Sequence, residues 1–288
     1  MLKRNLTAIV LVAIALFVLL YLRTLFVELS DILFFAFMVF GGYEMYAVGK
    51  KSGYRALPLP LLLYVIAFYP LFYFFSMTGS VIAAMLSLIV ALSDYVIERK
   101  KYELNDLLYT FLILLYPLLL CGCFFYINHS AGNLLGLFFV ILVTSLSDAF
   151  ALFIGMLFGK KKLIEDVSPK KTVAGVFGAY LGGLIGATAT FLLFDVFAVF
   201  RSFENVGILR IFDSLAIAIP VYYALALCCT TAAIFGDLAA SLLKRKMGIK
   251  DFGKIFPGHG GVMDRLDSLL FVAPVVCLFF TIYYGVIL

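Results

Sequence analysis

Long runs of apolar residues follow one another along the chain, and only short polar segments separate them. A helix needs about 17–25 mostly apolar residues to cross a bilayer, and nine runs are of that order. The expected spans are 6–22, 25–48, 56–75, 78–97, 106–127, 131–158, 173–198, 208–239 and 269–287. The pattern predicts an all-α polytopic membrane protein in which 131–158 and 208–239 continue as helix beyond the hydrocarbon.

The composition supports this prediction and excludes other classes of protein. Hydrophobic residues make up 65% of the 288 residues and charged residues only 14%, whereas soluble domains are about half apolar and a quarter charged. A soluble enzyme and a disordered chain are therefore excluded. The five cysteines all lie in apolar runs, so we interpret them as small packing residues rather than a disulfide or metal framework.

The basic residues predict the orientation of the chain in the membrane. All 22 Lys and Arg residues except Arg23, Arg201 and Arg210 fall in alternate loops, counted from the N-terminus. The positive-inside rule then places the N-terminus in the cytoplasm and the C-terminus outside. No small-residue cleavage site follows the first apolar run, so we expect a retained helix and not a signal peptide.

Two of the expected cytoplasmic loops are more complex than connectors, namely 159–172 and 240–268. We therefore divide the chain into an N-terminal transmembrane region of about five spans, 1–130, and a catalytic membrane region, 131–288. No internal repeat is evident in the sequence.

The C-terminal loop carries most of the candidate chemistry. If the preceding helix continues to about residue 245, Asp237, Ser241 and Lys244 fall at i, i+4 and i+7 on one face. Asp264 and Asp267 are spaced i, i+3 at the start of the last span and also share a face. An acid near the end of an apolar run is costly, which favours a functional role for Asp237.

Between these two groups lies a glycine-rich segment, Pro257–Gly261. Its backbone can approach a ligand closely, and successive amides can form an anion-binding concavity. Neighbouring carboxylates repel one another unless a cation lies among them, and their hard oxygens favour Mg²⁺. With basic residues for a polyphosphate, the set predicts metal-assisted phosphoryl or nucleotidyl transfer. Taken alone, the basic run Lys244–Lys246 is better explained as a topological anchor.

A second polar element precedes the span at 173–198. With Ser168 as N-cap and Pro169 at the first helical position, free backbone amides beside Lys170 and Lys171 would face an anion. An ordinary capped helix with anchoring lysines is the alternative on these residues alone.

Asp148 lies inside an apolar run, where an acidic residue is expected to have a function. Gly155 and Gly159 follow it at i+7 and i+11, so a carboxylate and two small residues form one stripe along the helix.

The run from Ser241 to Asp267 resembles the signature of the phosphatidate cytidylyltransferases, the CDP-diacylglycerol synthases. The matching elements are Ser241, Lys244-Arg245, Lys250-Asp251, Pro257–Gly261, Asp264-Arg265 and Asp267. The resemblance implies an Mg²⁺-dependent nucleotidyltransferase of phospholipid biosynthesis, which joins CTP and phosphatidate to give CDP-diacylglycerol and pyrophosphate. It also implies a multi-pass protein of the inner, cytoplasmic membrane.

The resemblance further implies a role for each matching residue. Asp237 and Asp264 would hold the catalytic Mg²⁺, with Asp267 as a supporting ligand, and a second cation at the same site stays open. Residues implied to bind substrate are Asp148, Ser168, Lys170, Lys171, Thr172, Ser241, Lys244, Arg245 and Arg265, with Lys250, Asp251 and His259 ordering the loop. His259 is expected to contact phosphate or brace the loop, because a phosphate nucleophile is already ionised near neutral pH and needs no general base.

Four positions depart from the family pattern. This chain has Leu152, Met156, Ala174 and Ala240 where the family has Tyr, Arg, Glu and Glu. The departures spare the C-terminal signature but reduce the polar lining expected around it.

Three alternatives remain besides the cytidylyltransferase. A CTP-dependent polyprenol or phytol kinase would transfer the γ-phosphoryl group to a lipid alcohol, and the complete signature argues against it. A transporter would place charges near mid-membrane, often in repeated halves, whereas here they gather at one face. A catalytically silent relative is the third. CTP, phosphatidate and membrane lipids are the expected partners, without nucleic acid, and a homodimer stays open.

Overall fold

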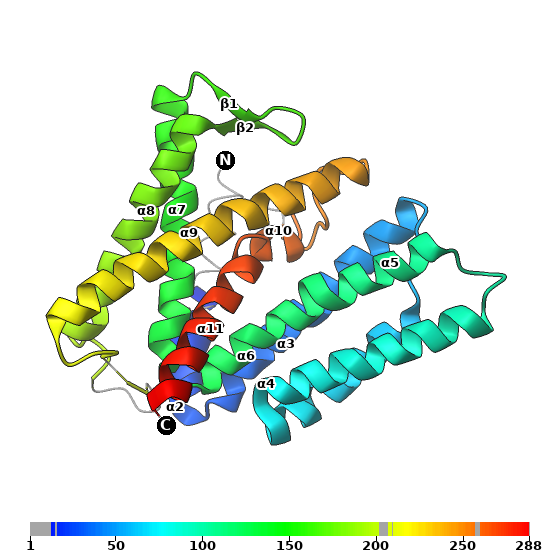
Figure 1. Ribbon diagram of the computed structural model, residues 1–288, viewed down its shortest axis with the longest axis horizontal. Coiled ribbons are helices and arrows are strands. Elements are labelled where there is room, and N and C mark those ends of the chain that lie inside the picture. The colour runs from blue at the N-terminus through cyan, green and yellow to red at the C-terminus, as the bar shows by residue number, and fades with distance from the viewer. Residues whose placement is uncertain (1–12, 15, 202–206, 209, 257–259, 288) are drawn as a thin grey trace.

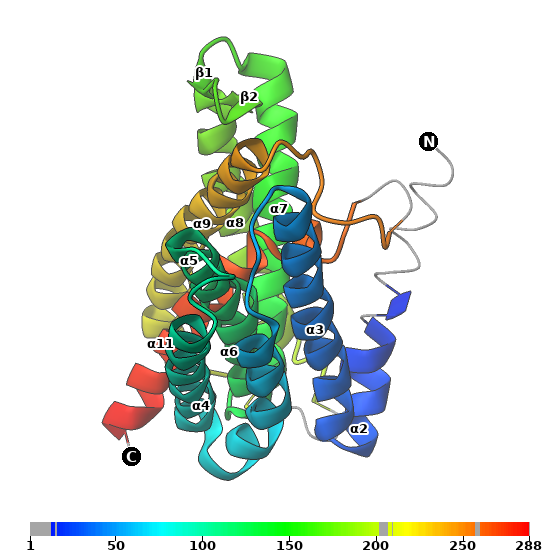
Figure 2. The ribbon, with the colours of Figure 1, turned by 90° about the vertical axis from the view of Figure 1, so that its right-hand side faces the viewer.

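The computed structural model describes the whole chain except residues 1–12, 15, 202–206, 209, 257–259 and 288. It is a bundle of helices with one small β-hairpin at its edge (Figures 1 and 2). The helices are α2 (Arg23–Leu25), α3 (Glu28–Lys51), α4 (Pro58–Ile97), α5 (Leu104–Ile113), α6 (Leu120–His129), α7 (Asn133–Phe158), α8 (Val173–Phe191), α9 (Leu215–Lys246), α10 (Met263–Leu266) and α11 (Leu269–Ile287). The π-helical turns are η1 (Phe17–Leu22), η2 (Leu114–Leu119) and η3 (Leu192–Val196), and the strands are β1 (Lys162–Ile164) and β2 (Ser168–Thr172).

In the part of the chain that the structure describes, six helices are long and apolar enough to cross a membrane. They are α3, α4, α5 continued through η2 into α6, α7, α8 continued into η3, and α9. The all-α, multi-span prediction is confirmed to that extent. Of the remaining expected spans, 269–287 corresponds to the shorter apolar helix α11. Residues 6–12 and 15 of the expected span 6–22 lie outside the described residues, and its last six residues form η1. The cytoplasmic and outer assignment of the two ends stays a prediction.

Helix α4 contains two of the expected spans, because the chain reverses inside it. Ser76 has φ 53° and ψ −138°, which is not helical. The Tyr64 hydroxyl lies 3.3 Å from Ser80 Oγ, although sixteen residues of straight helix would separate them by roughly 24 Å. Two antiparallel arms therefore follow one another, and the reversal is visible at the bottom of Figure 2. Phe68 packs edge-on against Phe125 of α6, with ring centroids 4.8 Å apart.

Helices α7 and α8 run side by side in both views and pack backbone against backbone (Figures 1 and 2). A Cβ on Gly178 would lie 2.5 Å from the Phe150 carbonyl oxygen, and one on Gly186 would lie 2.7 Å from Val143 Cα. A Cβ on Gly182 would overlap the Leu146 carbonyl oxygen. Glycine at these positions permits the close approach of two membrane helices.

The loop before α8 folds as an antiparallel hairpin, which corrects the prediction of a helix that starts after Ser168. Ser168 pairs with Ile164 and Thr172 with Lys162. The N-cap is Thr172, whose side chain accepts a hydrogen bond from the Gly175 N–H. Strand pairing satisfies the backbone up to Thr172, and Pro169 is tolerated because a two-stranded sheet has only edge strands.

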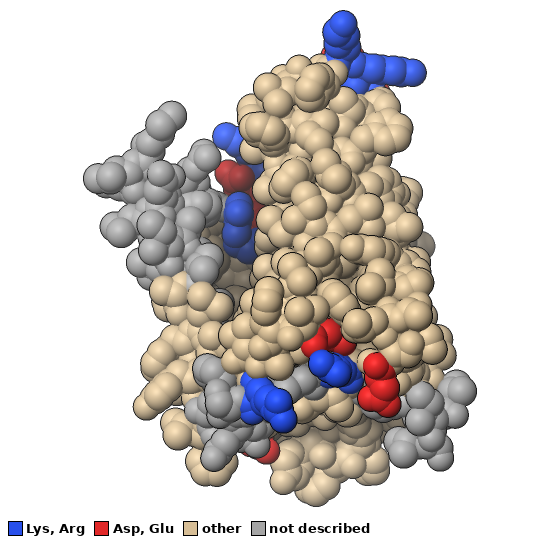
Figure 3. Space-filling view, turned by 90° about the vertical axis from the view of Figure 1, so that its left-hand side faces the viewer, with Lys and Arg blue, Asp and Glu red and all other residues tan. Residues whose placement is uncertain are grey.

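One face of the molecule has few charged side chains over most of its area, and those in view lie at the top, along the left edge and near the bottom (Figure 3). Phe177 and Leu181 of α8 and Phe153 and Leu157 of α7 are exposed large apolar residues. Such an apolar surface is expected of helices that face lipid.

The α7–α8 contact predicts a position-specific effect of added volume. Gly182→Val should lower the free energy of unfolding by ~1–3 kcal/mol, because the new side chain meets the α7 backbone and forces the helices apart. Ala189→Val, on the same helix at a half-buried position, is the matched control. The apparent melting temperature in detergent measures both. Equal melting temperatures for the two variants would contradict the close packing.

Candidate active site

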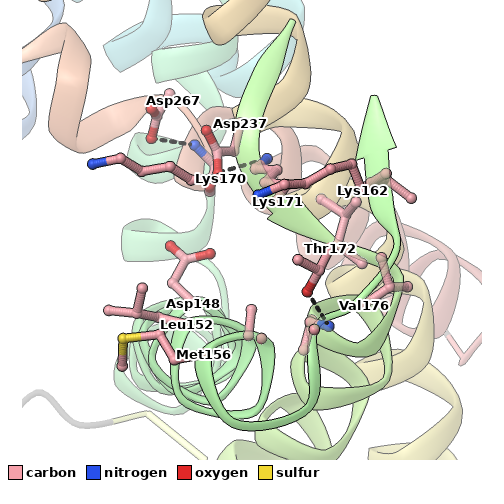
Figure 4. A pocket seen from close by; sticks show the side chains of 18 of the residues that line it. Asp148, Leu152, Met156, Lys162, Lys170, Lys171, Thr172, Val176, Asp237 and Asp267 are labelled. Atoms are coloured by element: carbon pink, nitrogen blue, oxygen red, sulfur yellow. Dashed lines mark hydrogen bonds and ion pairs between the residues drawn. The ribbon is translucent and has the colours of Figure 1, made fainter. Parts of the chain in front are cut away.

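A pocket of about 670 Å³ opens where α7, the hairpin, α8, α9 and the α10 region meet (Figure 4). Seven of the residues that the sequence predicts for the site line it: Asp148, Lys170, Lys171, Thr172, Asp237, Asp264 and Asp267. These residues come from four separate stretches of the chain. The fold therefore gathers acidic and basic side chains at one place.

Asp237 is held by partners from two elements. Lys171 Nζ of β2 lies 2.6 Å from Asp237 Oδ2, and Ser241 donates a 3.3 Å hydrogen bond to Asp237 Oδ1. Since α9 continues to Lys246, the predicted shared helical face is confirmed. The ion pair joins the hairpin to α9.

Asp264 is almost fully buried, and both of its carboxylate oxygens have partners. Lys244 Nζ lies 3.1 Å from Oδ1, and Oδ2 accepts hydrogen bonds from the backbone N–H groups of Phe252 (2.8 Å) and Gly261 (2.9 Å). Gly260 has φ +84°, and a Cβ there would lie 2.7 Å from Oδ2. Glycine at 260 thus satisfies both the backbone conformation and the close approach of the carboxylate.

Asp267 follows α10 and is half-buried at the pocket wall. Burial, and next the negative charge of Asp237, raises the pKa of Asp267 to about 6. A hydrogen bond from the Ser268 N–H, 2.9 Å long, opposes this shift. A cation bound among these carboxylates would favour their ionised forms.

Asp148 projects from α7 toward the level of Asp237 and Asp267 (Figure 4). The stripe predicted with it is confirmed, because Gly155 and Gly159 line the same pocket. A Cβ on Gly155 would lie 3.1 Å from Thr172 Oγ1, and one on Gly159 would lie 2.6 Å from it. The two glycines let the end of β2 approach α7.

The departures Leu152 and Met156 form an apolar wall of this pocket. Their side chains are 63% and 69% exposed, respectively. The pocket therefore has a polar side built from the hairpin, α9 and α10, and an apolar side on α7. Ala240, in contrast, is fully buried in α9.

The other predicted site residues lie around the pocket or away from it. Lys244 contacts Asp264 and Ser241 contacts Asp237, so both lie next to carboxylates that line the pocket. Arg245 donates a 3.4 Å hydrogen bond to the Val167 carbonyl, and Ser168 begins β2. Lys250, Asp251 and Arg265 are exposed. His259 and the residues Pro257 and Gly258 lie outside the described part of the chain.

Three further residues belong to the site region and were not predicted for it. Lys162 lines the pocket, although its basic run was interpreted only as a topological signal. Ser268 also lines it, and its hydroxyl is buried without a hydrogen-bond partner among the described residues. Glu44 of α3 contacts the α10 region; its one sequence signal is an acid inside an apolar run.

The donor set agrees in kind with a magnesium site. Carboxylate oxygens converge on the pocket beside basic side chains, and Mg²⁺ typically takes one or two carboxylates together with substrate phosphates. Among the residues that the structure describes, no group of three or more His, Cys, Asp or Glu side chains could hold a metal by itself. An Mg²⁺ ion at this place would need further oxygen ligands, such as water or phosphate.

The fold and the pocket define a polytopic protein with an acid- and lysine-lined site. The chain belongs to the cytidylyltransferase family, whose family model matches residues 2–283.

Three relatives are named phosphatidate cytidylyltransferase. The Thermotoga maritima protein is 38% identical over 165 residues, which cover 56% of this chain and 54% of the relative. The Aquifex aeolicus protein is 32% identical over 229 residues, covering 80% and 73%. The Bacillus subtilis protein is 30% identical over 197 residues, covering 66% and 64%. The match thus spans about half to three quarters of these relatives.

The Lys244–Asp264 pair predicts a stability effect that is separate from activity. The two side chains are 15% and 4% exposed, so removal of the ammonium leaves a buried carboxylate without its counter-charge. Lys244→Met should cost about 3 kcal/mol of unfolding free energy. Lys246→Met, at an exposed position of the same helix, should cost little. Melting temperatures in detergent without added divalent cation compare the two, and a stable Lys244→Met variant would contradict the argument.

Proposed function

We propose that this protein is a phosphatidate cytidylyltransferase, which joins CTP and phosphatidate to give CDP-diacylglycerol and pyrophosphate. The observation that carries the proposal is the pocket itself, in which Asp148, Asp237, Asp264 and Asp267 meet Lys162, Lys170 and Lys171. Carboxylates and lysines at one pocket suit a metal-bound polyphosphate. The names of the relatives support the same substrates.

The two sides of the pocket fit the two substrates. The polar side, with the lysines of the hairpin, would take the phosphates of CTP from the cytosol. The apolar side, with Leu152 and Met156 exposed on the membrane helix α7, would take the acyl chains of phosphatidate from the inner leaflet. A lipid head group could then reach the polar side without leaving the membrane.

In the reaction, a phosphatidate oxygen attacks the α-phosphorus of CTP, and the bond from that phosphorus to the β-phosphate oxygen breaks. Pyrophosphate leaves with that electron pair. The phosphate nucleophile is ionised near neutral pH, so no protein side chain has to remove a proton. Lys170 and Lys171 would offset the negative charge of the two substrates as they approach.

Mg²⁺, when bound, would supply charge neutralisation on the transferring and leaving phosphates. Asp237 and Asp264 are the residues that would hold it, with Asp267 in support. Lys171 and Lys244 balance the charges of Asp237 and Asp264, respectively. When substrate arrives, these lysines would turn from the carboxylates to the phosphates.

The test uses detergent-purified protein with phosphatidate, Mg²⁺ and CTP labelled in parallel at the α- or the γ-phosphate. We expect the α-label in extractable lipid and the γ-label in pyrophosphate. Asp264→Asn and Asp237→Asn should each lower turnover on the order of 100-fold or more. Asp166→Asn, an exposed acid in the hairpin turn, should leave turnover unchanged.

Other label distributions would overturn the proposal in defined ways. In a parallel assay with a polyprenol in place of phosphatidate, the γ-label in lipid with release of CDP would identify a lipid kinase. CTP binding without turnover would identify a silent relative. Normal turnover in a folded Asp264→Asn variant would refute the role of that carboxylate. Because Asp264 accepts backbone hydrogen bonds, its variant needs a melting curve, and Asp237→Asn serves as the second probe.

A further inference from the structure

Glu44 lies in the middle of an apolar helix, α3, and its side chain is only 4% exposed. Among the residues that the structure describes, no Lys, Arg or His side chain forms an ion pair with this carboxylate. Instead, Oε1 accepts a hydrogen bond from the Val262 N–H (3.1 Å) and Oε2 accepts one from the Met263 N–H (2.8 Å). The contact joins residues more than 200 positions apart in the chain.

These two N–H groups belong to the start of α10, directly before Asp264. Helix α10 has only four residues, and its N-cap residue Val262 supplies no side-chain cap. The first N–H groups of a helix lack partners within the helix, and when buried they need an acceptor. A carboxylate at this end also suits the positive end of the helix dipole. Glu44 therefore caps α10 from another helix.

The loop between α9 and α10 approaches this carboxylate closely at two glycines. A Cβ on Gly253 or on Gly261 would overlap the Glu44 carboxylate oxygens. Gly253 and Gly261 lie close to each other, since the Cβ of Gly253 would be 3.0 Å from Gly261 Cα. Two segments of the loop, at Gly253 and at Gly261, therefore meet at Glu44. Only glycine at these two positions leaves room for the carboxylate.

Glu44 and Asp264 contact the same two backbone segments, residues 252–253 and 261–262. Asp264 Oδ2 accepts from the N–H groups of Phe252 and Gly261. Glu44 contacts the next residue of each segment, Gly253 and Val262. The position of the Asp264 carboxylate is therefore determined together with that of Glu44.

We propose that Glu44 is a positioning residue for the active site. Through it, the N-terminal helix α3 fixes the start of α10, the short helix that carries Asp264. The catalytic part of this inference rests on the proposed cytidylyltransferase function, whereas the tether between α3 and the loop does not. Glu44 does not line the substrate pocket, so its effect on the reaction is transmitted through α10.

The first test measures kinetics of Glu44→Gln and Glu44→Ala, with Glu28→Gln, an exposed acid of the same helix, as control. Glutamine keeps the size of the side chain but presents an NH₂ group to one of the two N–H donors. We expect kcat to fall about 10- to 100-fold in Glu44→Gln while KM for phosphatidate stays within about twofold. A merely structural role would lower the melting temperature and the active fraction but leave kcat per folded molecule unchanged, and that result would overturn the proposal.

The second test measures the tether without activity, by trypsin cleavage of the full-length protein in detergent. Lys254 lies in the loop two residues before Phe256 and is exposed. We expect Glu44→Ala and Glu44→Gln to raise the cleavage rate at Lys254 about tenfold, and Glu28→Gln to leave it unchanged. Unchanged cleavage in both Glu44 variants would refute the tether, and an inactive wild-type protein would refute only the proposed function.

The third test is a double-variant cycle, which isolates the contact between Glu44 and the loop. Gly253→Ala should accelerate cleavage and lower kcat, because its methyl group displaces the carboxylate. In the Glu44→Ala background the same substitution should have a clearly smaller effect on both, because only the 3.0 Å contact with Gly261 Cα remains. Full additivity would show that Gly253 acts independently of Glu44 and would contradict the proposal. If Glu44→Ala does not fold, the Glu44→Gln background replaces it.

Discussion

The buried carboxylate of Asp264 and the half-buried one of Asp237 both need a counter-charge, and the lysines that supply it hold the site together. Asp237 receives its counter-charge from Lys171 of the hairpin, and Asp264 receives it from Lys244 of α9. Each pair joins elements that are distant in sequence. An isolated charge would be costly in this low-dielectric setting, so the ion pairs and the arrangement of β2, α9 and α10 stabilise one another. Substrate phosphates could compete for the same lysines.

The site also depends on how closely backbones approach. Glycines on α8 let it lie against α7, and Gly155 and Gly159 let Thr172 approach from the hairpin. A side chain at these positions would push the hairpin, and with it Lys171, away from α9. The same helix pair carries Leu152 and Met156 on the apolar wall of the pocket. Helix packing and the division of the pocket into polar and apolar sides thus have a common origin.

The contact of Glu44 with α10 relates the N-terminal helices to the loop chemistry. The division of the chain into an N-terminal transmembrane region and a catalytic region describes where the motifs lie. It does not describe which side chains support them, since α3 supplies both acceptors for the first N–H groups of α10. Anchoring helices and site-forming helices are therefore not separate structural units at this point.

The sequence by itself determined the class of protein, the long apolar helices and the motif that carries the chemistry. Apolar length and helical spacing are local properties, so the reach of α9 to Lys246 and the shared face of Asp237 and Ser241 could be predicted. The hairpin at Ser168–Thr172 could not, because pairing of β1 with β2 competes with a local helix-start signal. The Lys171–Asp237 pair and the capping of α10 by Glu44 were likewise decided only by the tertiary structure. Both join positions far apart in the chain, and no spacing rule records which distant partner satisfies a buried charge or a free N–H group.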